Sequence, residues 1–439
     1  MSRERLGTGL VRGVIAMAAI IAMALVVAAC GGGGSSSSSS STPSESSTTS
    51  AEGSGGEGAE TAAKVDCPVH GLVISNFTGE GAENGEGTKA ALKIALKKVE
   101  ESGGVLGCPL EITYKDDGSD YTKDLPLMQE AVGQQDYAWV MNNDYGCATT
   151  APFITREKLF SVSSCSLPGF ANPKYNPMSF DTQFNNEHIE AFTGEYLPKK
   201  GFKKVAYITD TSAFGKGDAQ VLGESLEKNG GELVDTEYAE LSAVDFTSAL
   251  NRAKGADPEV LVINLFGPAV GHVMANLKTM GWEVPVFFSG SSPYSSLQQL
   301  GVPLDQAEGI EGVTISANSY PSSKPAEELL KDLQAENVEI NGGLGLFTQP
   351  ADALTTFAWT ANKAGSLDPE KLTETLAESG DVKIPNLTGE ETLGYTAECH
   401  ENVGKGGIVT VQEGYFNEGR LKLIEPQEFP EFPCSEPVE

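Results

Sequence analysis

The sequence predicts an α/β protein made of two doubly wound parallel-sheet lobes with a cleft between them. Short apolar runs alternate with amphipathic stretches, and this strand and helix cycle occurs as two separate series. Repeated strand–helix units imply right-handed crossovers and parallel sheets covered by helices on both faces. The part of the chain with this pattern, about 370 residues, is too long for one hydrophobic core. Two lobes are therefore expected.

The first series begins with an apolar run, Val69–Ser75, which predicts a strand. The following stretch, Thr88–Ser102, places its apolar residues on one helical face and its lysines on the other. The DDGSD stretch, Asp116–Asp120, predicts a turn and helix cap rather than a calcium loop, because the spaced ligands of such a loop are absent. Further strands are expected at 110–114, 137–141 and 159–162, with helices up to Gln134 and from near Thr149.

The second series repeats the cycle and leads to a tail that returns to the first lobe from about Thr314. Its strands are expected at 205–209, 232–236, 260–264 and 286–288, and its helices at 214–228, 245–253 and 268–280. The return carries helices near 324–334, 350–364 and 368–378, before strands at 408–411 and 415–424. The predicted first lobe is 65–183 and 315–390, and the second is 184–314 and 391–434. Ligands of open parallel sheets bind at the carboxyl ends of the strands.

The amino end has the pattern of a lipoprotein export signal. Three arginines precede a short apolar stretch, Val14–Ala29, that ends in Val-Ala-Ala-Cys. Residues 1–29 are predicted to be a signal peptide, with Cys30 as the lipid-modified residue; a chance cysteine after an ordinary signal peptide is the alternative. Residues 30–64 are rich in Gly and Ser and predict a disordered linker.

Six cysteines remain once Cys30 is set aside, and an even number in an exported chain predicts disulfides. Each cysteine lies near the end of an expected strand or in the tail, and adjacent strand ends lie within bridging distance. No CxxC occurs, and the four histidines are scattered, which argues against a metal site. The expected pairs are Cys67 with Cys108, Cys147 with Cys165, and Cys399 with Cys434.

Charge and motifs exclude several classes of function. The net charge of −31 argues against a nucleic-acid surface, which needs clustered Lys and Arg. The chain contains no GxSxG, HExxH or GxxxxGK[ST] motif, so no enzyme is expected. A GxGxxA match at Gly85–Ala90 lies too far beyond its strand for a dinucleotide site, so no cofactor is expected.

Five segments in order carry a resemblance to a known family. They are SNFTG (75–79), EESGGVLGCPLEITYKDDGSD (100–120), ITDTSAFGKG (208–217), VDFTSALNRAKGADPEVLVIN (244–264) and MGWEVPVFFSG (280–290). From about Val65 to Pro426 the chain resembles the type I periplasmic solute-binding proteins of the leucine/isoleucine/valine-binding family. The resemblance implies two lobes that close on a small solute by a hinge. It also implies a monomer that serves the permease of an ABC importer, and the lipoprotein signal places it on the outer face of the cell membrane; a sensing receptor subunit is the alternative.

The resemblance also implies ligand contacts from both lobes. A ligand carboxylate would meet hydroxyls and backbone N–H groups near a helix N-terminus, whose dipole favours an anion. For each residue the alternative is a purely structural role, as a helix cap or a packed aromatic. The implied contacts are Asn143, Asp144, Tyr145, Cys147, Ala148, Thr149 and Thr150, then Ser164, Cys165, Ser166 and Leu167, and from the second lobe Phe214 and Phe266.

The sequence departs from the family at one position. Amino-acid-binding members usually place a Glu after the strand that here ends in FFSG, where this chain has Ser291. A buried ammonium without a paired acid costs several kcal/mol. Either Asp144, Asp210 or Glu187 replaces the missing acid, or the ligand is an amide, a urea-like solute or an organic acid without an ammonium group.

Overall fold

The computed structural model describes most of the chain beyond the linker. The described residues are 65–79, 82–142, 146–165, 167–183, 185–290, 292, 297, 301–340, 343–380, 384, 394–402, 408–417, 420–424 and 434–437. They belong to one compact unit, Ala59–Glu439. The predicted signal peptide, Cys30 and the whole predicted linker lie outside the described residues. Within the described ranges, no helix has the length and apolar character needed to span a membrane.

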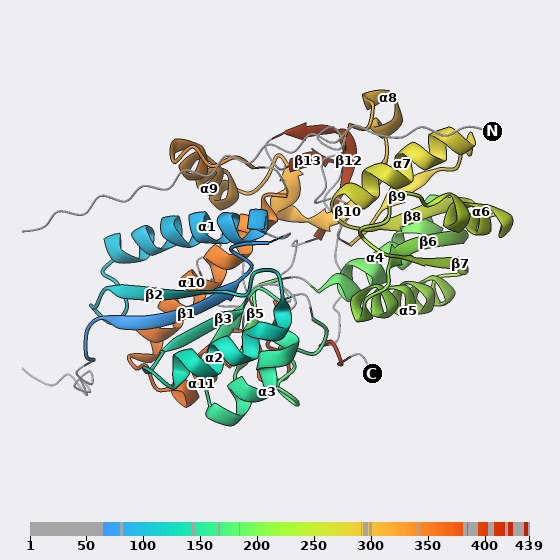
Figure 1. The fold of residues 1–439 in the computed structure, drawn as a ribbon. Coiled ribbons are helices and arrows are strands. Elements are labelled where there is room, and N and C mark those ends of the chain that lie inside the picture. The colour runs from blue at the N-terminus through green and yellow to red at the C-terminus, as the bar shows by residue number, and fades with distance from the viewer. Residues whose placement is uncertain are drawn as a thin grey trace, which may run out of the picture. The chain divides into compact units, whose positions relative to one another are not determined.

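The first sheet has five parallel strands in the order β2-β1-β3-β4-β5 (Figure 1). Val69 pairs with Leu110 at the amino end of β1, and Ser75 pairs with Asp116 at its carboxyl end. The strands are β1 Val69–Ser75, β2 Leu110–Asp116, β3 Trp139–Asn142, β4 Ser161–Ser163 and β5 Ser179–Asp181.

Helices cover both faces of this sheet, because its central strands bury side chains on both sides. Val69 and Val73 of β1 pack in a cluster with residues of α1, α9, α10 and α11, whereas Leu72 and Ile74 pack in a cluster with α2 and α3. The helices are α1 Ala82–Glu101, α2 Asp124–Val132, α3 Cys147–Glu157, α9 Lys324–Ala335, α10 Gly345–Ala364 and α11 Pro369–Ala377, and a 3-10 turn, Tyr121–Lys123, precedes α2.

The second sheet has eight strands in the order β11-β13-β12-β10-β9-β8-β6-β7. The strands from β6 to β10 are parallel, but β12 runs antiparallel to β10 and to β13. The second sheet is therefore parallel-rich and carries an antiparallel strand from the tail. The strands are β6 Lys204–Asp210, β7 Glu232–Ala239, β8 Val260–Asn264, β9 Val286–Phe288, β10 Glu311–Ile315, β11 Ser319–Tyr320, β12 Ile408–Asn417 and β13 Arg420–Leu423.

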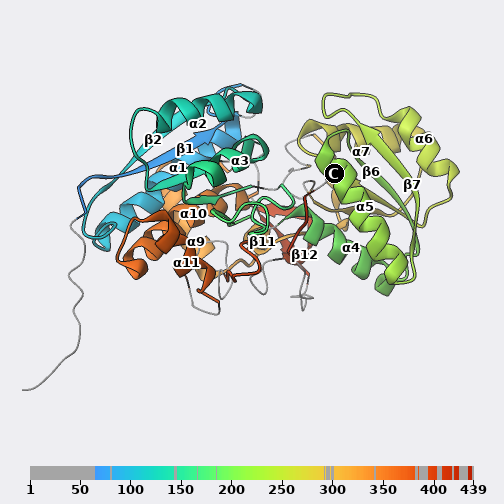
Figure 2. The same cartoon turned by 90° about the horizontal axis from the view of Figure 1, so that it is seen from below.

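Helices again cover both faces of the central strands. Residues of α4 and α5 form one buried cluster with Val205 and Val262, and α4 and α5 lie side by side (Figure 2). Residues of α6 and α7 form another cluster with Ile208 and Ile263. The helices are α4 Asn186–Lys200, α5 Ala213–Lys228, α6 Thr247–Gly255, α7 Pro268–Met280 and α8 Leu304–Ala307; a 3-10 turn, Ser316–Asn318, follows β10.

The structure confirms the predicted fold class, and the bounds of β1, β8, α7 and β9 are as predicted. The pattern does not predict α4. Its buried residues include His188, Glu190 and Thr193, so its apolar residues form no simple helical stripe.

Two segments of the chain differ from the predicted division into lobes. Residues 315–320 were assigned to the first lobe, but Ile315 ends β10 and Ser319–Tyr320 form β11, both in the second sheet. Tail residues 391–434 were assigned to the second lobe, and β12 and β13 do lie there. However, His400 donates its backbone N–H to the Ala171 carbonyl and accepts the backbone N–H of Asp181, so this part of the tail lies against β5 of the first lobe.

Candidate functional site

Two loops at the carboxyl edge of the first sheet are tied together by a disulfide. Cys147 begins α3 after β3, and Cys165 follows β4; their Cα atoms are 6.3 Å apart. Both cysteines are fully buried and pack with Phe170 and the partly buried Leu167. The bridge therefore joins the start of α3 covalently to the segment after β4. The predicted bridges Cys67–Cys108 and Cys399–Cys434 are also present.

Asn142, the last residue of β3, organises the start of α3. Its Nδ2 donates to Oδ2 of Asp124 at 2.9 Å, and its Oδ1 accepts from Oγ1 of Thr150 at 3.0 Å. Its backbone carbonyl accepts from the backbone N–H of Ser164 at 3.3 Å. Asn142 thus connects α2 and α3 through its side-chain amide and the loop after β4 through its backbone carbonyl.

The predicted residues of α3 differ in what they offer a ligand. Ala148 is exposed and Thr149 is half-buried, with the Thr149 hydroxyl donating to Gly146 O at 2.9 Å. Thr150 is fully buried, and its hydroxyl faces Asn142. Backbone N–H groups of the first helical turn have no partners within the helix, so they are the anion donors that this element offers.

Polar side chains of the first lobe form hydrogen bonds with the loop after β4. Ser164 is buried and donates from its hydroxyl to Oε1 of Gln183 at 3.2 Å. The backbone N–H of Cys165 donates to Oδ1 of Asp181 at 3.0 Å. Burial raises the pKa of Asp181 well above its usual value. Asn143, Asp144, Tyr145, Ser166 and Ser291 lie outside the described residues.

The carboxyl edge of the second sheet carries the two predicted aromatics. Phe266 follows β8 and is 37% exposed, which is high for a large apolar side chain, and Phe214 is half-buried in the first turn of α5. The loop after β8 is fixed by Ser292, whose Oγ accepts from the backbone N–H of Leu265 at 2.9 Å and donates to Leu265 O at 3.0 Å. Exposed aromatic surface beside a fixed loop suits a ligand-lining role.

Beneath this edge lies a group of buried acids that the sequence pattern did not single out. Asn264, at the end of β8, donates from Nδ2 to Oδ2 of Asp218 at 2.8 Å and contacts the Tyr207 hydroxyl at 2.7 Å. Burial raises the pKa of Asp218 to about 8. Burial, followed by the charge of Asp218, raises the pKa of the fully buried Glu190 well above its usual value. A single sequence contains no signal that these acids are buried.

Two of the three candidate replacements for the missing acid can be placed. Glu187 lies in the first turn of α4, where burial followed by the charge of Glu401 raises its pKa to about 7, and its carboxyl group interacts with the Ser435 side chain. Asp210 ends β6 and accepts the backbone N–H of Ser212 at 2.7 Å. Both acids are therefore already engaged within the chain.

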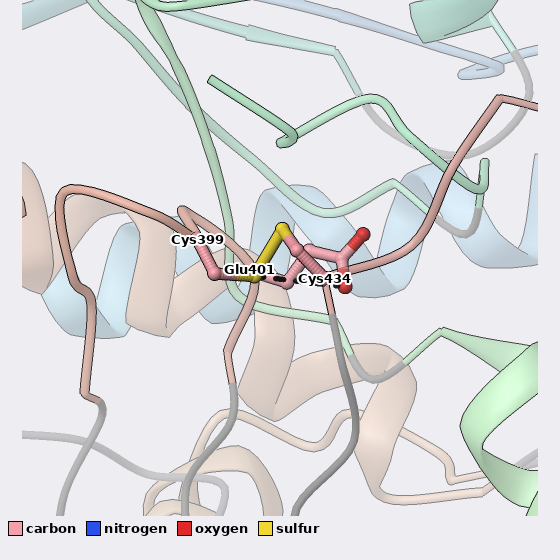
Figure 3. Close-up of side chains that lie close together, drawn as sticks. All are labelled: Cys399, Glu401 and Cys434. Atoms are coloured by element: carbon pink, nitrogen blue, oxygen red, sulfur yellow. Dashed lines mark hydrogen bonds between the residues drawn. A yellow bond between two sulfur atoms is a disulfide. The ribbon is translucent and has the colours of Figure 1, made fainter. Parts of the chain in front are cut away.

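Cys399, Glu401 and Cys434 lie close together on the tail (Figure 3). The two sulfurs are joined in a disulfide, so the group offers a metal only the Glu401 carboxylate. That carboxylate already accepts from the backbone N–H and the hydroxyl of Ser435, each at 3.1 Å. The disulfide and these hydrogen bonds therefore link two parts of the tail, which is a structural role.

A hollow of about 350 Å³ lies on the second lobe between α7 and residues 301–306. Its walls include His272, Lys278 and Gln306 and none of the predicted ligand residues.

The fold and the carboxyl-edge loops define a two-lobe protein of the kind that binds solutes. Residues 72–415 match the family described as periplasmic binding protein, and the chain belongs to this family. Its members are non-enzymatic solute-binding proteins that work outside the cytoplasm.

Similar proteins agree with this assignment. The leucine-, isoleucine-, valine-, threonine- and alanine-binding protein of Pseudomonas aeruginosa is 22% identical over 320 residues, which are 72% of this chain and 83% of that protein. A type 1 periplasmic binding protein from Bordetella pertussis superposes with a TM-score of 0.71 at 22% identity, covering 81% of this chain and all of the other. A solute-binding protein of an ABC transporter from Rhodopseudomonas palustris, solved with 3,4-dihydroxybenzoic acid, gives 0.68 at 21% identity, covering 84% and 98%.

Proposed function

We propose that this protein is the substrate-binding lipoprotein of an ABC importer and that it captures a small organic acid by hinge closure. The observation that supports this most directly is the disulfide-braced pair of loops at the start of α3. Backbone N–H groups at such a helix start bind a carboxylate. Phe214 and Phe266 of the second lobe would cover the apolar part of the ligand when the lobes close.

The state of the buried acids supports an acid without an ammonium group as the ligand. An ammonium group needs an ionised carboxylate in contact with it. Asp218 and Glu190, beneath the second-lobe edge, favour their neutral forms because burial raises their pKa values, and Glu187 is half neutral near pH 7. The Rhodopseudomonas protein binds an aromatic acid of this kind, whereas the Pseudomonas protein binds amino acids.

We expect 4-methylpentanoate to bind more tightly than leucine, which has the same carbon skeleton with an added ammonium group. The difference is expected to be at least about tenfold, equivalent to about 1.4 kcal/mol, because the ammonium would be desolvated without a partner. Isothermal titration calorimetry measures both affinities on protein that has been unfolded and refolded to remove bound ligand. The same titration with 4-hydroxybenzoate provides an aromatic probe. Tighter binding of leucine would contradict the proposed ligand class and shift attention to Asp144, Asp210 or Glu187.

The lipid anchor is the second part of the proposal and rests on the sequence before Cys30. We expect Cys30→Ala to move the protein from the membrane fraction to the soluble extracytoplasmic fraction, because the thiol is the site of lipid attachment. Immunoblotting of fractionated cells measures this, with Cys30→Ser as a second variant that also lacks the thiol. Full membrane retention of both variants would argue against the anchor.

A further inference from the structure

Each lobe has the same hydrogen bond at the carboxyl edge of its sheet, between an asparagine that ends a strand and a buried aspartate. In the first lobe, Nδ2 of Asn142 donates to the buried Asp124 at 2.9 Å; in the second, Nδ2 of Asn264 donates to the buried Asp218 at 2.8 Å. Each asparagine ends a central strand of its sheet, and a loop that the resemblance assigns to the ligand follows it. The recurrence in two separate sheets points to a role in shaping those loops.

The contact between Asp124 and the start of α3 is unusually close. A Cβ atom added to Gly146, the residue before α3, would lie 1.5 Å from Oδ2 of Asp124. The carboxyl group of Asp124 therefore lies against the backbone that begins the anion-binding helix. Any change in its charge acts directly on that helix start.

Asp124 also contacts a second acid, Asp117, which follows β2. Both side chains are fully buried, and Oδ1 of Asp124 and Oδ2 of Asp117 lack hydrogen-bond partners among the other described groups. The two carboxyl groups interact with each other through their side chains. A proton held between the two carboxyl groups would give both buried oxygens a partner, at a place where two adjacent negative charges would be costly.

We propose that Asn142 and Asp124 are positioning residues of the ligand-binding loop, and that Asp124 acts as a carboxylic acid that shares a proton with Asp117. In this form Asp124 accepts from Asn142, and Asn142 accepts from Thr150, so the start of α3 is held in place. This inference deepens the proposed function and rests on it, because the loop in question is the proposed carboxylate site.

The shared proton links ligand affinity to pH. Burial, followed by the charge of Asp117, raises the pKa of Asp124 to about 7. Loss of the proton adds a negative charge beside the helix start that must hold the ligand carboxylate, so affinity falls as pH rises. The other described charges that act on the pair are those of Asp116, Asp120 and Lys123, and Lys123 Nζ donates to the Asp117 carbonyl at 3.0 Å.

The test compares wild type with Asp124→Asn, which keeps the shape of the neutral acid and its acceptor but cannot ionise. With 4-methylpentanoate or 4-hydroxybenzoate as the probe, we expect wild-type affinity to fall about tenfold between about pH 6 and pH 8.5 at constant ionic strength. Asp124→Asn is expected to show no such fall over the same pH range. The matched control, Asp136→Asn, removes one charge from an exposed acid that is not among those acting on the pair, and should keep the wild-type pH profile.

A second readout needs no ligand. Infrared difference spectra of wild type minus Asp124→Asn should show a carboxylic-acid C=O band that disappears as pH rises through about 7. Asp117→Asn, the variant to use if Asp124→Asn does not fold, removes the neighbouring charge and should move the disappearance of this band to lower pH. An unchanged pH profile in Asp124→Asn, or the absence of the band, would overturn the shared proton. If neither probe binds wild type at any pH, the proposed ligand class fails, and the infrared titration decides the state of the acid pair separately.

Discussion

Replacing Cys147 and Cys165 together by serine is expected to weaken binding of the carboxylate probe by at least about tenfold and to lower the free energy of unfolding by about 3 kcal/mol. The bridge closes a segment with a sequence separation of 18, and a loop of that length contributes about 3 kcal/mol through the unfolded state. The affinity loss has a separate cause. The bridge holds the start of α3 and the loop after β4 at a fixed spacing, and binding must restore that spacing once the bridge is gone.

The matched control is the paired replacement of Cys67 and Cys108. This bridge closes a longer segment, with a sequence separation of 41, and lies at the amino end of β1 and β2, away from the carboxyl-edge loops. Its loss should cost at least as much stability and leave the affinity nearly unchanged. Urea unfolding and calorimetry at a temperature well below both midpoints separate the two effects. Equal affinity losses in both variants would show that the first bridge has no special role at the site.

The strands and most helices could be predicted because their signals are local. The apolar run Val260–Asn264 and the helix Pro268–Met280, with proline at its start and Gly281 after its end, need no tertiary information. Two of the disulfide pairs follow from the same source, since adjacent parallel strands bring their ends together, whereas Cys399 and Cys434 both lie in the tail. The helix α4 could not be predicted in this way because its buried positions include Glu190 and His188, whose burial depends on partners distant in sequence.

The candidate site could be predicted only as a set of loops. The position of Thr149 and Thr150 near the start of a helix follows from the sequence pattern, but the direction of the Thr150 hydroxyl depends on Asn142, eight residues earlier and on another element. The acids that set the electrostatics of both edges, Asp124 and Asp218, occur in ordinary acidic stretches of a strongly acidic chain. Only their tertiary burial distinguishes them.

We expect the free energy of unfolding to decrease as pH rises from about 5.5 to about 7.5, by about 5 kcal/mol. Burial raises the pKa values of Asp124 and Glu187 to about 7 and that of Asp218 to about 8, whereas unfolded acids titrate near their usual values. Between these values the folded state binds more protons than the unfolded state, so rising pH favours unfolding. The stability from each acid is fully present below its unfolded pKa and is lost as pH rises through the folded pKa.

One buried histidine acts in the opposite direction over part of this range. Burial lowers the pKa of His400 to about 4, so the unfolded state binds the extra proton below about pH 6.5 and rising pH favours folding there. Above that pH the histidine no longer opposes the buried acids, among them Asp181 and Glu190, and the decrease should be steepest. Acids whose pKa is lowered, such as Asp116, held by hydrogen bonds from Thr78 and Gly118, act only below this range.

Urea unfolding at a series of pH values measures the decrease, and Asp218→Asn is the informative variant. Asparagine keeps an acceptor for Asn264 but cannot ionise. Between about pH 6.5 and pH 8, the free energy of unfolding of the variant should therefore fall more slowly than that of wild type, by up to about 1.4 kcal/mol per pH unit. Asp305→Asn, which removes an exposed acid from the short helix α8, controls for net charge and should retain the wild-type slope. A wild-type stability that rises with pH across this range would mean that the buried acids are ionised in the folded protein, and would remove the physical basis for a shared proton at Asp124.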